Sequence, residues 1–199
     1  GGGLRRMPRA RHRRYESRAA GTTERDTRRN VTRPGAALRV TSVEHMANRR
    51  AVVTGASSGI GEAVVRALRA GEWDVVGVAR RAARLEALDA EIGSRSYAAD
   101  LTSEADVAAL AAHLEDTGPV HALVHVAGGA RGTQRVEDGD PDDWRWMFEV
   151  NVLSAQLVTS ALLPHLRRAA EADGHADTVY VTSTAAQTAY PGGAGYNAA

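Results

Sequence analysis

The chain has 199 residues, of which 43% are hydrophobic, and this is enough to bury one sizeable core. It contains no cysteine, which excludes disulfide bonds and thiolate metal sites. No apolar run approaches the roughly 18 residues of a membrane span, so the sequence predicts no membrane contact. The absence of cysteine fits a reducing compartment, and we expect a cytoplasmic location.

The formal net charge of +1 conceals a strong asymmetry between two parts of the chain. Residues 1–50 hold 14 Arg and 4 acidic residues, whereas residues 51–199 hold 11 Arg and 20 acidic residues; no lysine occurs anywhere. Residues 1–45 show almost no apolar periodicity, which predicts a disordered basic extension. A targeting segment and a nucleic-acid-binding arm are the alternatives, but a natural start at Met46 favours a non-functional extension without a nucleic-acid partner.

Strand and helix patterns alternate from residue 50 onward. "RAVVTG" predicts a buried strand, and "GIGEAVVRALRAG" predicts an amphipathic helix that ends at Gly71. "DVVGVA", "RSYAA", "HALVHVAGG" and "DTVYVTS" predict four further strands, separated by helical patterns over residues 84–91, 102–116 and 142–168. Helices of this length between strands imply right-handed crossovers and a parallel sheet. The predicted fold class is α/β, a doubly wound parallel sheet of about five strands over residues 46–199.

The first strand-to-helix turn reads "TGASSGIG" and carries Gly55, Gly59 and Gly61. Glycines here permit positive φ and let backbone N–H groups approach a pyrophosphate, whose charge the following helix N-terminus favours. The position of the turn, between a buried strand and an amphipathic helix, makes it a much stronger signal than a glycine trio alone. The sequence therefore predicts a Rossmann-type dinucleotide site, with a tight turn that binds no ligand as the alternative.

Several motifs in the same order resemble the short-chain dehydrogenase/reductase family over residues 50–199. "TGASSGIG" is similar to the family's cofactor turn, "AADLT" to its adenine-contacting aspartate, and "VNVLS" to its helix motif with a catalytic asparagine. "VTSTAAQTAYPGGAGYNAA" is similar to its serine strand followed by its YxxxK motif, with Tyr196 placed 13 residues after Ser183. The resemblance implies a cofactor site built from Gly55, Ser57, Ser58, Gly59, Ile60, Gly61, Arg80, Asp100, Leu101, Ala127 and Gly128, and a catalytic set of Asn151, Ser183 and Tyr196.

The resemblance also implies the chemistry: an oxidoreductase that transfers a hydride between a nicotinamide cofactor and a small carbonyl or alcohol substrate. Tyr196 would be the general acid that protonates the carbonyl oxygen, or the base in the reverse direction. Ser183 would hydrogen-bond the same oxygen, and Asn151 would hold a water of the proton relay. Taken singly, Ser183 as a local cap and Asn151 as an exposed helical residue are the simpler interpretations; together they favour catalysis.

The cofactor preference depends on the end of the second predicted strand. NAD-preferring members of the family carry an acid there that accepts a hydrogen bond from the ribose, whereas this chain has Ala79 followed by Arg80 and Arg81. We therefore expect NADP(H) in preference to NAD(H), with Arg80, and in second place Arg81, paired to the 2′-phosphate. The alternative is that these arginines form a solvated helix start.

Two positions depart from the family pattern. Its NNAG motif reads "HVAG" here, and a single histidine such as His125 at a strand end favours a packed, neutral ring over a ligand or an acid/base group. The motif lysine would stand immediately beyond Ala199, and no lysine in the chain replaces it. We therefore expect a truncated fragment with an open sheet edge that is inactive by itself, whereas the full-length form is expected to be a homo-oligomer. A non-catalytic NADP(H)-binding sensor is the alternative function.

Overall fold

The computed structural model describes residues 49–199, and the predicted extension over residues 1–45 lies outside them. Five strands are present in this part of the chain: β1 Arg50–Thr54, β2 Asp74–Ala79, β3 Arg95–Ala98, β4 Ala122–His125 and β5 Asp177–Tyr180. The α-helices are α1 Gly59–Ala70, α2 Ala82–Ile92, α3 Glu104–Glu115, α4 Pro141–Phe148, α5 Ser154–Asp173 and α6 Ala194–Ala198. Short 3-10 turns, η1 Val136–Asp138 and η3 Thr184–Ala186, and a π-helical segment, η2 Glu149–Leu153, complete the described elements.

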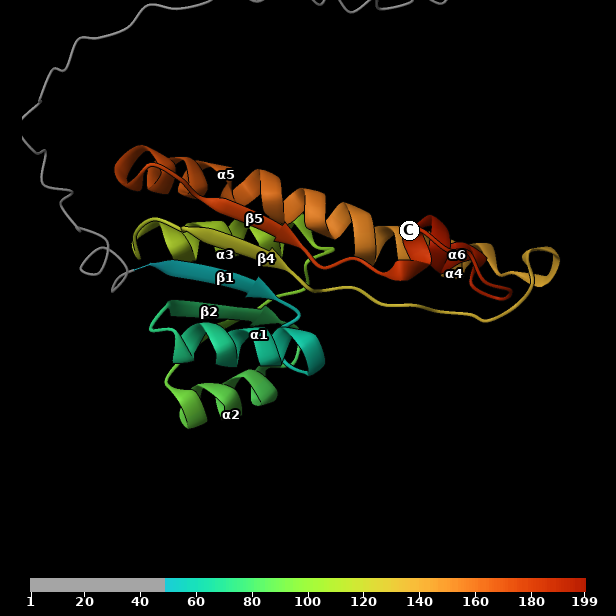
Figure 1. Ribbon diagram of the computed structural model, residues 1–199, viewed down its shortest axis with the longest axis horizontal. Helices are drawn as coiled ribbons and strands as arrows, with labels where there is room; N and C mark the ends of the chain where they lie inside the picture. Colours follow the sequence, from blue (N-terminus) through green and yellow to red (C-terminus); the bar gives the residue numbers. More distant parts are fainter. Residues whose placement is uncertain (1–48) are drawn as a thin grey trace, which may run out of the picture. The chain divides into compact units, whose positions relative to one another are not determined.

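The five strands form one parallel sheet in the order β3-β2-β1-β4-β5. The strand arrows point to the same end of the sheet, where α4 and α6 lie (Figure 1). The order reverses at β1, because β2 and β3 extend on one side of it and β4 and β5 on the other. In open α/β sheets, ligands bind at such a reversal, beyond the carboxyl ends of the strands. The predicted doubly wound parallel fold is thereby confirmed.

Two hydrophobic layers cover the two faces of the sheet. On one face, Val52 of β1 packs in a cluster with Leu110 of α3 and Leu162 of α5. On the other face, Val53 packs in a cluster with Val65 of α1 and Leu85 of α2. Neighbouring strand residues thus face opposite layers, as the pleat of a strand requires. Helices on both faces explain why β1, β2 and β4 are nearly continuous buried runs rather than alternating patterns.

The helical region predicted over residues 142–168 consists of three successive segments. α4 begins at Pro141, after Asp140 caps it by accepting a hydrogen bond from the N–H of Asp142. The π-helical segment η2 then adds one residue per turn before α5 continues to Asp173. Such bulges are rare and frequently lie at functional sites. In this chain the bulge contains Asn151, one of the predicted catalytic residues.

The continuous helical stretch of residues 141–173 is long and apolar enough, by length and composition, to cross a membrane. This differs from the sequence-based expectation, which considered only uninterrupted apolar runs. A core helix of a soluble protein passes the same test, and α5 buries Val158, Leu162 and Leu166 in the layer against the sheet.

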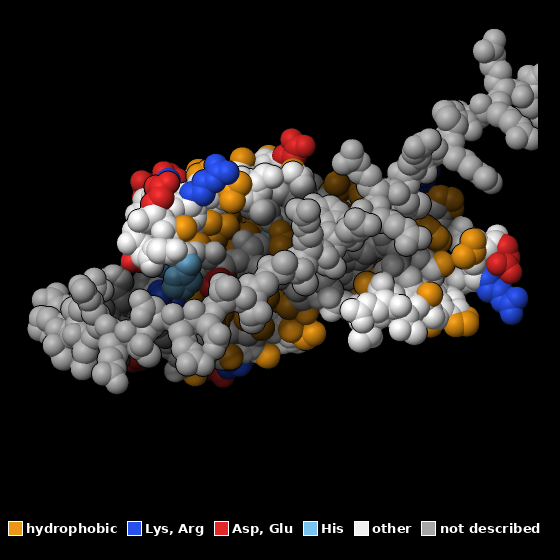
Figure 2. Space-filling view, turned by 45° about the horizontal axis from the view of Figure 1, so that its top comes forward, with side chains coloured by type: hydrophobic (Ala, Val, Ile, Leu, Met, Phe, Trp, Pro, Cys, Tyr) orange, Lys and Arg blue, Asp and Glu red, His pale blue; other side chains and the backbone are white. Residues whose placement is uncertain are grey.

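Strand β5 is an edge of the sheet, because β4 is its only partner among the described strands. Its burial pattern is exposed throughout, and Val179 and Tyr180 are 46% and 50% exposed. Phe148, Leu153 and Leu163 of the adjoining helical stretch are also exposed, and hydrophobic side chains appear at the surface in Figure 2. The predicted open edge is therefore present within residues 49–199.

Candidate functional site

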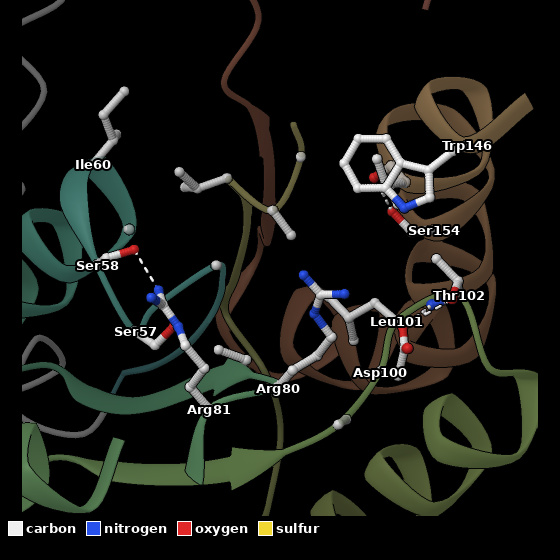
Figure 3. Close-up of a pocket in the computed structure, with 18 residues that line it drawn as sticks. Ser57, Ser58, Ile60, Arg80, Arg81, Asp100, Leu101, Thr102, Trp146 and Ser154 are labelled. Carbon is white, nitrogen blue, oxygen red and sulfur yellow. Dashed lines mark hydrogen bonds between the residues drawn. The ribbon is translucent and has the colours of Figure 1, made fainter. Parts of the chain in front are cut away.

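A pocket of about 470 Å³ lies at the carboxyl ends of β1, β2 and β4 (Figure 3). Its walls contain every predicted cofactor residue except Gly59, which is the first residue of α1 beside them. The lining residues are Gly55, Ser57, Ser58, Ile60, Gly61, Ala79, Arg80, Arg81, Ala99, Asp100, Leu101, Thr102, Val126, Ala127, Gly128, Trp146, Val150 and Ser154. The predicted set, drawn from four separate segments, thus meets around one cavity.

The glycines of the first turn are required by close backbone approaches. Gly55 has φ +69°, and a Cβ there would lie 2.9 Å from the backbone nitrogen of Ala127. A Cβ on Gly61 would overlap the carbonyl oxygen of Gly55. The turn therefore lies directly against the segment that follows β4, with its backbone N–H groups at the N-terminus of α1. This geometry is the cradle that a pyrophosphate requires.

Two neighbouring arginines at the end of β2 have different surroundings. Arg81 donates to Oγ of Ser57 from Nε at 3.1 Å and from Nη2 at 2.8 Å, and to Oγ of Ser58 at 2.6 Å. Arg80 makes no hydrogen bond or ion pair with any residue in the described part of the chain. In Figure 3 its side chain lies between the serine turn and Asp100. Arg80 is therefore the cation free to receive an anionic group in this pocket.

Asp100 is ionised and held by its own turn at the end of β3. Its Oδ1 accepts from the backbone N–H of Thr102 at 3.1 Å and from the Thr102 hydroxyl at 2.8 Å. These two hydrogen bonds, with a smaller contribution from the charge of Arg80, hold the pKa of Asp100 below its ordinary value. The carboxylate keeps acceptor capacity free because Thr102 uses only one of its two oxygens.

The sequence did not predict the wall of the pocket that α4, η2 and α5 supply. Trp146, Val150 and Ser154 form this wall, and Trp146 extends toward the cavity in Figure 3. The Arg131 guanidinium lies 3.8 Å from the centre of the Trp146 ring, a cation–π contact. A Cβ on Gly129 would lie 2.9 Å from the same ring, so this glycine lets the loop after β4 pass close to it.

Asn151 clamps the loop after β4. Its Nδ2 donates to the carbonyl oxygen of Gly129 at 2.9 Å, and its Oδ1 accepts from the Gly129 N–H at 2.8 Å. Both polar atoms of the side chain therefore engage one peptide residue beside the pocket. The role of Asn151 in holding a water stays a prediction, while its role in fixing this loop follows from the two bonds.

Ser183 and Tyr196 lie at the same end of the sheet but do not line the pocket. Ser183 follows β5 and caps η3, because its Oγ accepts from the Ala185 N–H at 3.2 Å. Tyr196 lies on α6, whose Gly195 packs against Trp144 and Met147 of α4. The two residues thus lie at the same end of the sheet, but no hydrogen bond joins Ser183 to Tyr196 within residues 49–199.

His125, at the end of β4, is a packed and uncharged ring. Its Nε2 lies 3.0 Å from Oγ1 of Thr159, and its ring stacks on Tyr180 with centroids 4.6 Å apart. Burial lowers the pKa of His125 to about 4. The hydroxyl of Tyr180 bonds the same Thr159 oxygen at 2.8 Å, so the three side chains join β4, β5 and α5. This arrangement fits the structural interpretation of His125.

A family model described as short chain dehydrogenase matches residues 49–199. An uncharacterized oxidoreductase of Mycobacterium tuberculosis is 52% identical over 151 residues, which are 76% of this chain and 57% of the relative. The serine 3-dehydrogenase of Agrobacterium fabrum is 40% identical over 118 residues, which are 58% of this chain and 47% of that protein.

Among solved structures, the closed form of a serine dehydrogenase complexed with NADP+ resembles this fold with a TM-score of 0.69 and 29% identity. The match covers 75% of this chain and 60% of that one. The chain thus spans about half the length of the curated relatives it matches.

Proposed function

The chain belongs to the short chain dehydrogenase family, and from this premise we propose that the whole protein is an NADP(H)-dependent oxidoreductase of a small carbonyl or alcohol substrate. The observation that carries the proposal is the pocket at the sheet reversal, in which the glycine turn and Arg80 meet. The family supports the oxidoreductase class, and the residues of this chain support the choice of cofactor.

The pocket fits a nicotinamide dinucleotide at two places. The approach of Gly61 to Gly55 leaves no room for a side chain, so the turn offers bare backbone to a pyrophosphate. At the end of β2, buried Ala79 supplies no carboxylate for a ribose hydroxyl, while Arg80 supplies a cation that no side chain of residues 49–199 hydrogen-bonds. An unpaired guanidinium favours a phosphate, which it can bind with two parallel hydrogen bonds. These features support NADP(H) over NAD(H).

The bound cofactor supplies the hydride, and the residues of this chain manage the oxygen and the proton. The Oγ of Ser183 already accepts a hydrogen bond from the Ala185 N–H, so its own O–H is left to donate to a substrate carbonyl oxygen. Tyr196 donates the proton that completes the alcohol, or removes it in the reverse direction. Asn151 fixes the loop at Gly129 that borders the pocket. The proton donor Tyr196 and the hydrogen-bond donor Ser183 thus lie on different elements at the same end of the sheet.

The proposal includes a cytoplasmic location and, for the whole protein, self-association into a homo-oligomer. Exposed apolar residues on β5, α4 and α5 support association, because patches of this kind mark interaction surfaces. We also propose that the 199-residue chain by itself turns over poorly, since it contains no lysine to assist Tyr196.

The experiment that tests this function uses the full-length gene product and a panel of small aldehydes, ketones and hydroxy acids. Serine-like hydroxy acids are a reasonable first choice, because serine dehydrogenases are among the relatives. Change in NADPH absorbance is followed with each substrate, and cofactor binding is measured separately by calorimetry. Turnover of at least one carbonyl or alcohol supports the proposal. Binding of NADPH without turnover of any panel member would favour the non-catalytic sensor.

A further inference from the structure

Asn197, the neighbour of Tyr196 on α6, is bonded to the same residue as Ser183. Its Nδ2 donates to the carbonyl oxygen of Ala185 at 2.7 Å. The N–H of Ala185 donates to Oγ of Ser183 at 3.2 Å. Ala185 itself is buried, with 7% of its surface exposed. One peptide residue of η3 thus links the site serine to the helix that carries the site tyrosine.

Helix α6 depends on such external contacts because it is very short. It contains five residues, and the first turn of a helix costs more order than its few hydrogen bonds return. On one side Gly195 packs against Trp144 and Met147 of α4, where a Cβ would overlap the Met147 methyl group. Apolar packing of this kind is not directional. The hydrogen bond from Asn197 to Ala185 supplies the directional contact that fixes the rotation of α6.

The second polar atom of Asn197 is left without a partner. Its Oδ1 is buried and accepts no hydrogen bond from any group in residues 49–199. It faces Gly193, where a Cβ would lie 2.8 Å from it. An unsatisfied buried acceptor lowers stability, and local costs of this kind are typical of functional sites. The Asn197 amide therefore bonds Ala185 through Nδ2 while its Oδ1 stays without a hydrogen bond in this part of the chain.

We propose that Asn197 is a positioning residue that fixes the phenol oxygen of Tyr196 relative to the Ser183 hydroxyl, acting through the backbone of Ala185. The inference rests on the proposed function, in which one substrate oxygen must contact both hydroxyl groups. A displacement of about 1 Å in a catalytic group costs roughly 100-fold in rate. Loss of the Asn197 amide should therefore reduce turnover although Asn197 touches neither substrate nor cofactor.

The test is a double-mutant cycle in the full-length gene product, with Asn197→Ala and Tyr196→Phe. We expect Asn197→Ala to lower kcat about 10- to 100-fold with little change in the KM for NADPH. In the Tyr196→Phe background the same substitution should cost less than about twofold, because no phenol oxygen remains to be positioned. The matched control is Gln187→Ala. Gln187 directly follows η3, is exposed, and makes no side-chain hydrogen bond among the described residues.

The possible outcomes distinguish the role of Asn197 from the proposed function. If Asn197→Ala retains kcat within about twofold of the parent, or loses the same factor in both backgrounds, the inference is overturned. If Asn197→Ala does not fold, Asn197→Ser replaces it, since a serine hydroxyl is too short to reach the Ala185 carbonyl and the same criteria apply. Full turnover by Tyr196→Phe alone would contradict the proposed function itself and not only the role of Asn197.

Discussion

Arg81 holds Ser57 of the glycine turn through two hydrogen bonds, of 2.8 and 3.1 Å, to the same hydroxyl oxygen. The end of β2 is thereby tied to the turn that follows β1. A neighbouring bond to Ser58 makes the connection a three-point one. The two ends of the proposed cofactor site, the pyrophosphate cradle and the ribose phosphate position, are therefore held at a fixed separation before any ligand binds.

Replacement of this arginine should weaken the binding of both dinucleotides equally. In Arg81→Ala the turn loses all three bonds, and we expect the affinities for NADPH and NADH to fall together by about 10-fold. Calorimetric titration of each cofactor measures the change. A fall confined to NADPH would show that Arg81 instead pairs with the 2′-phosphate.

Replacement of the adjacent arginine should separate the two cofactors. Arg80→Ala removes the unpaired cation of the pocket, so NADPH affinity should fall about 10- to 100-fold while NADH affinity changes little. Combining it with Ala79→Asp should move the preference further toward NADH. Arg84→Ala, an exposed arginine on the following helix α2, is the control. An unchanged ratio of the two affinities would contradict the assignment of Arg80.

Trp146 provides an optical test of the pocket wall. Its ring lines the cavity, and the Arg131 guanidinium lies over one face of the ring. Bound NADPH should therefore quench part of the tryptophan fluorescence. In Trp146→Phe most of the quenching should disappear, whereas Trp73→Phe should keep it, because Trp73 packs against the core on the α1 side. Equal quenching in Trp146→Phe and the parent would place the cofactor away from this wall.

The sequence predicted the order of elements, and the residues that the family resemblance named for the cofactor line one pocket, because both depend on local patterns. Strand and helix periodicities and the glycine turn are written in consecutive residues, and right-handed crossovers then bring the four segments to one edge. It could not predict the π-helical segment at Asn151, since one extra residue in a turn leaves the apolar spacing nearly unchanged. It placed Arg80 before Arg81 at the 2′-phosphate but could not predict that Arg81 bonds the serine turn, because this contact depends on side-chain directions at a strand end. Trp146 was missed because an aromatic residue on a helix more often packs into a core.

Because His125 is neutral in the fold, the free energy of unfolding should depend on pH. Its pKa is about 4 in the folded protein and about 6.5 in an unfolded chain, so the unfolded state alone binds the proton between these values. Stability should therefore fall as the pH falls from about 6.5 to 4, by up to about 3 kcal/mol from this group. Burial also lowers the pKa of His165, so this residue should reduce stability at low pH in the same way.

Comparison with a variant isolates the contribution of His125. His125→Asn removes the titrating ring, and its free energy of unfolding, measured by urea titration, should depend less steeply on pH over this interval. The contribution of His125 is the difference between the unfolding free energies of variant and parent at each pH. Parallel curves would mean that His125 is not a buried neutral ring in solution.

We propose that Tyr196 is the proton donor of an NADPH-dependent carbonyl reduction. The direct measurement is the turnover number of the full-length gene product beside its Tyr196→Phe variant, with cofactor affinity determined for both. Removal of a general acid costs about 10²- to 10⁴-fold in rate. We expect a loss of this size in Tyr196→Phe, with NADPH affinity unchanged. Turnover of the Phe variant within a few fold of the parent would contradict it, because the phenol oxygen would then have no part in the reaction.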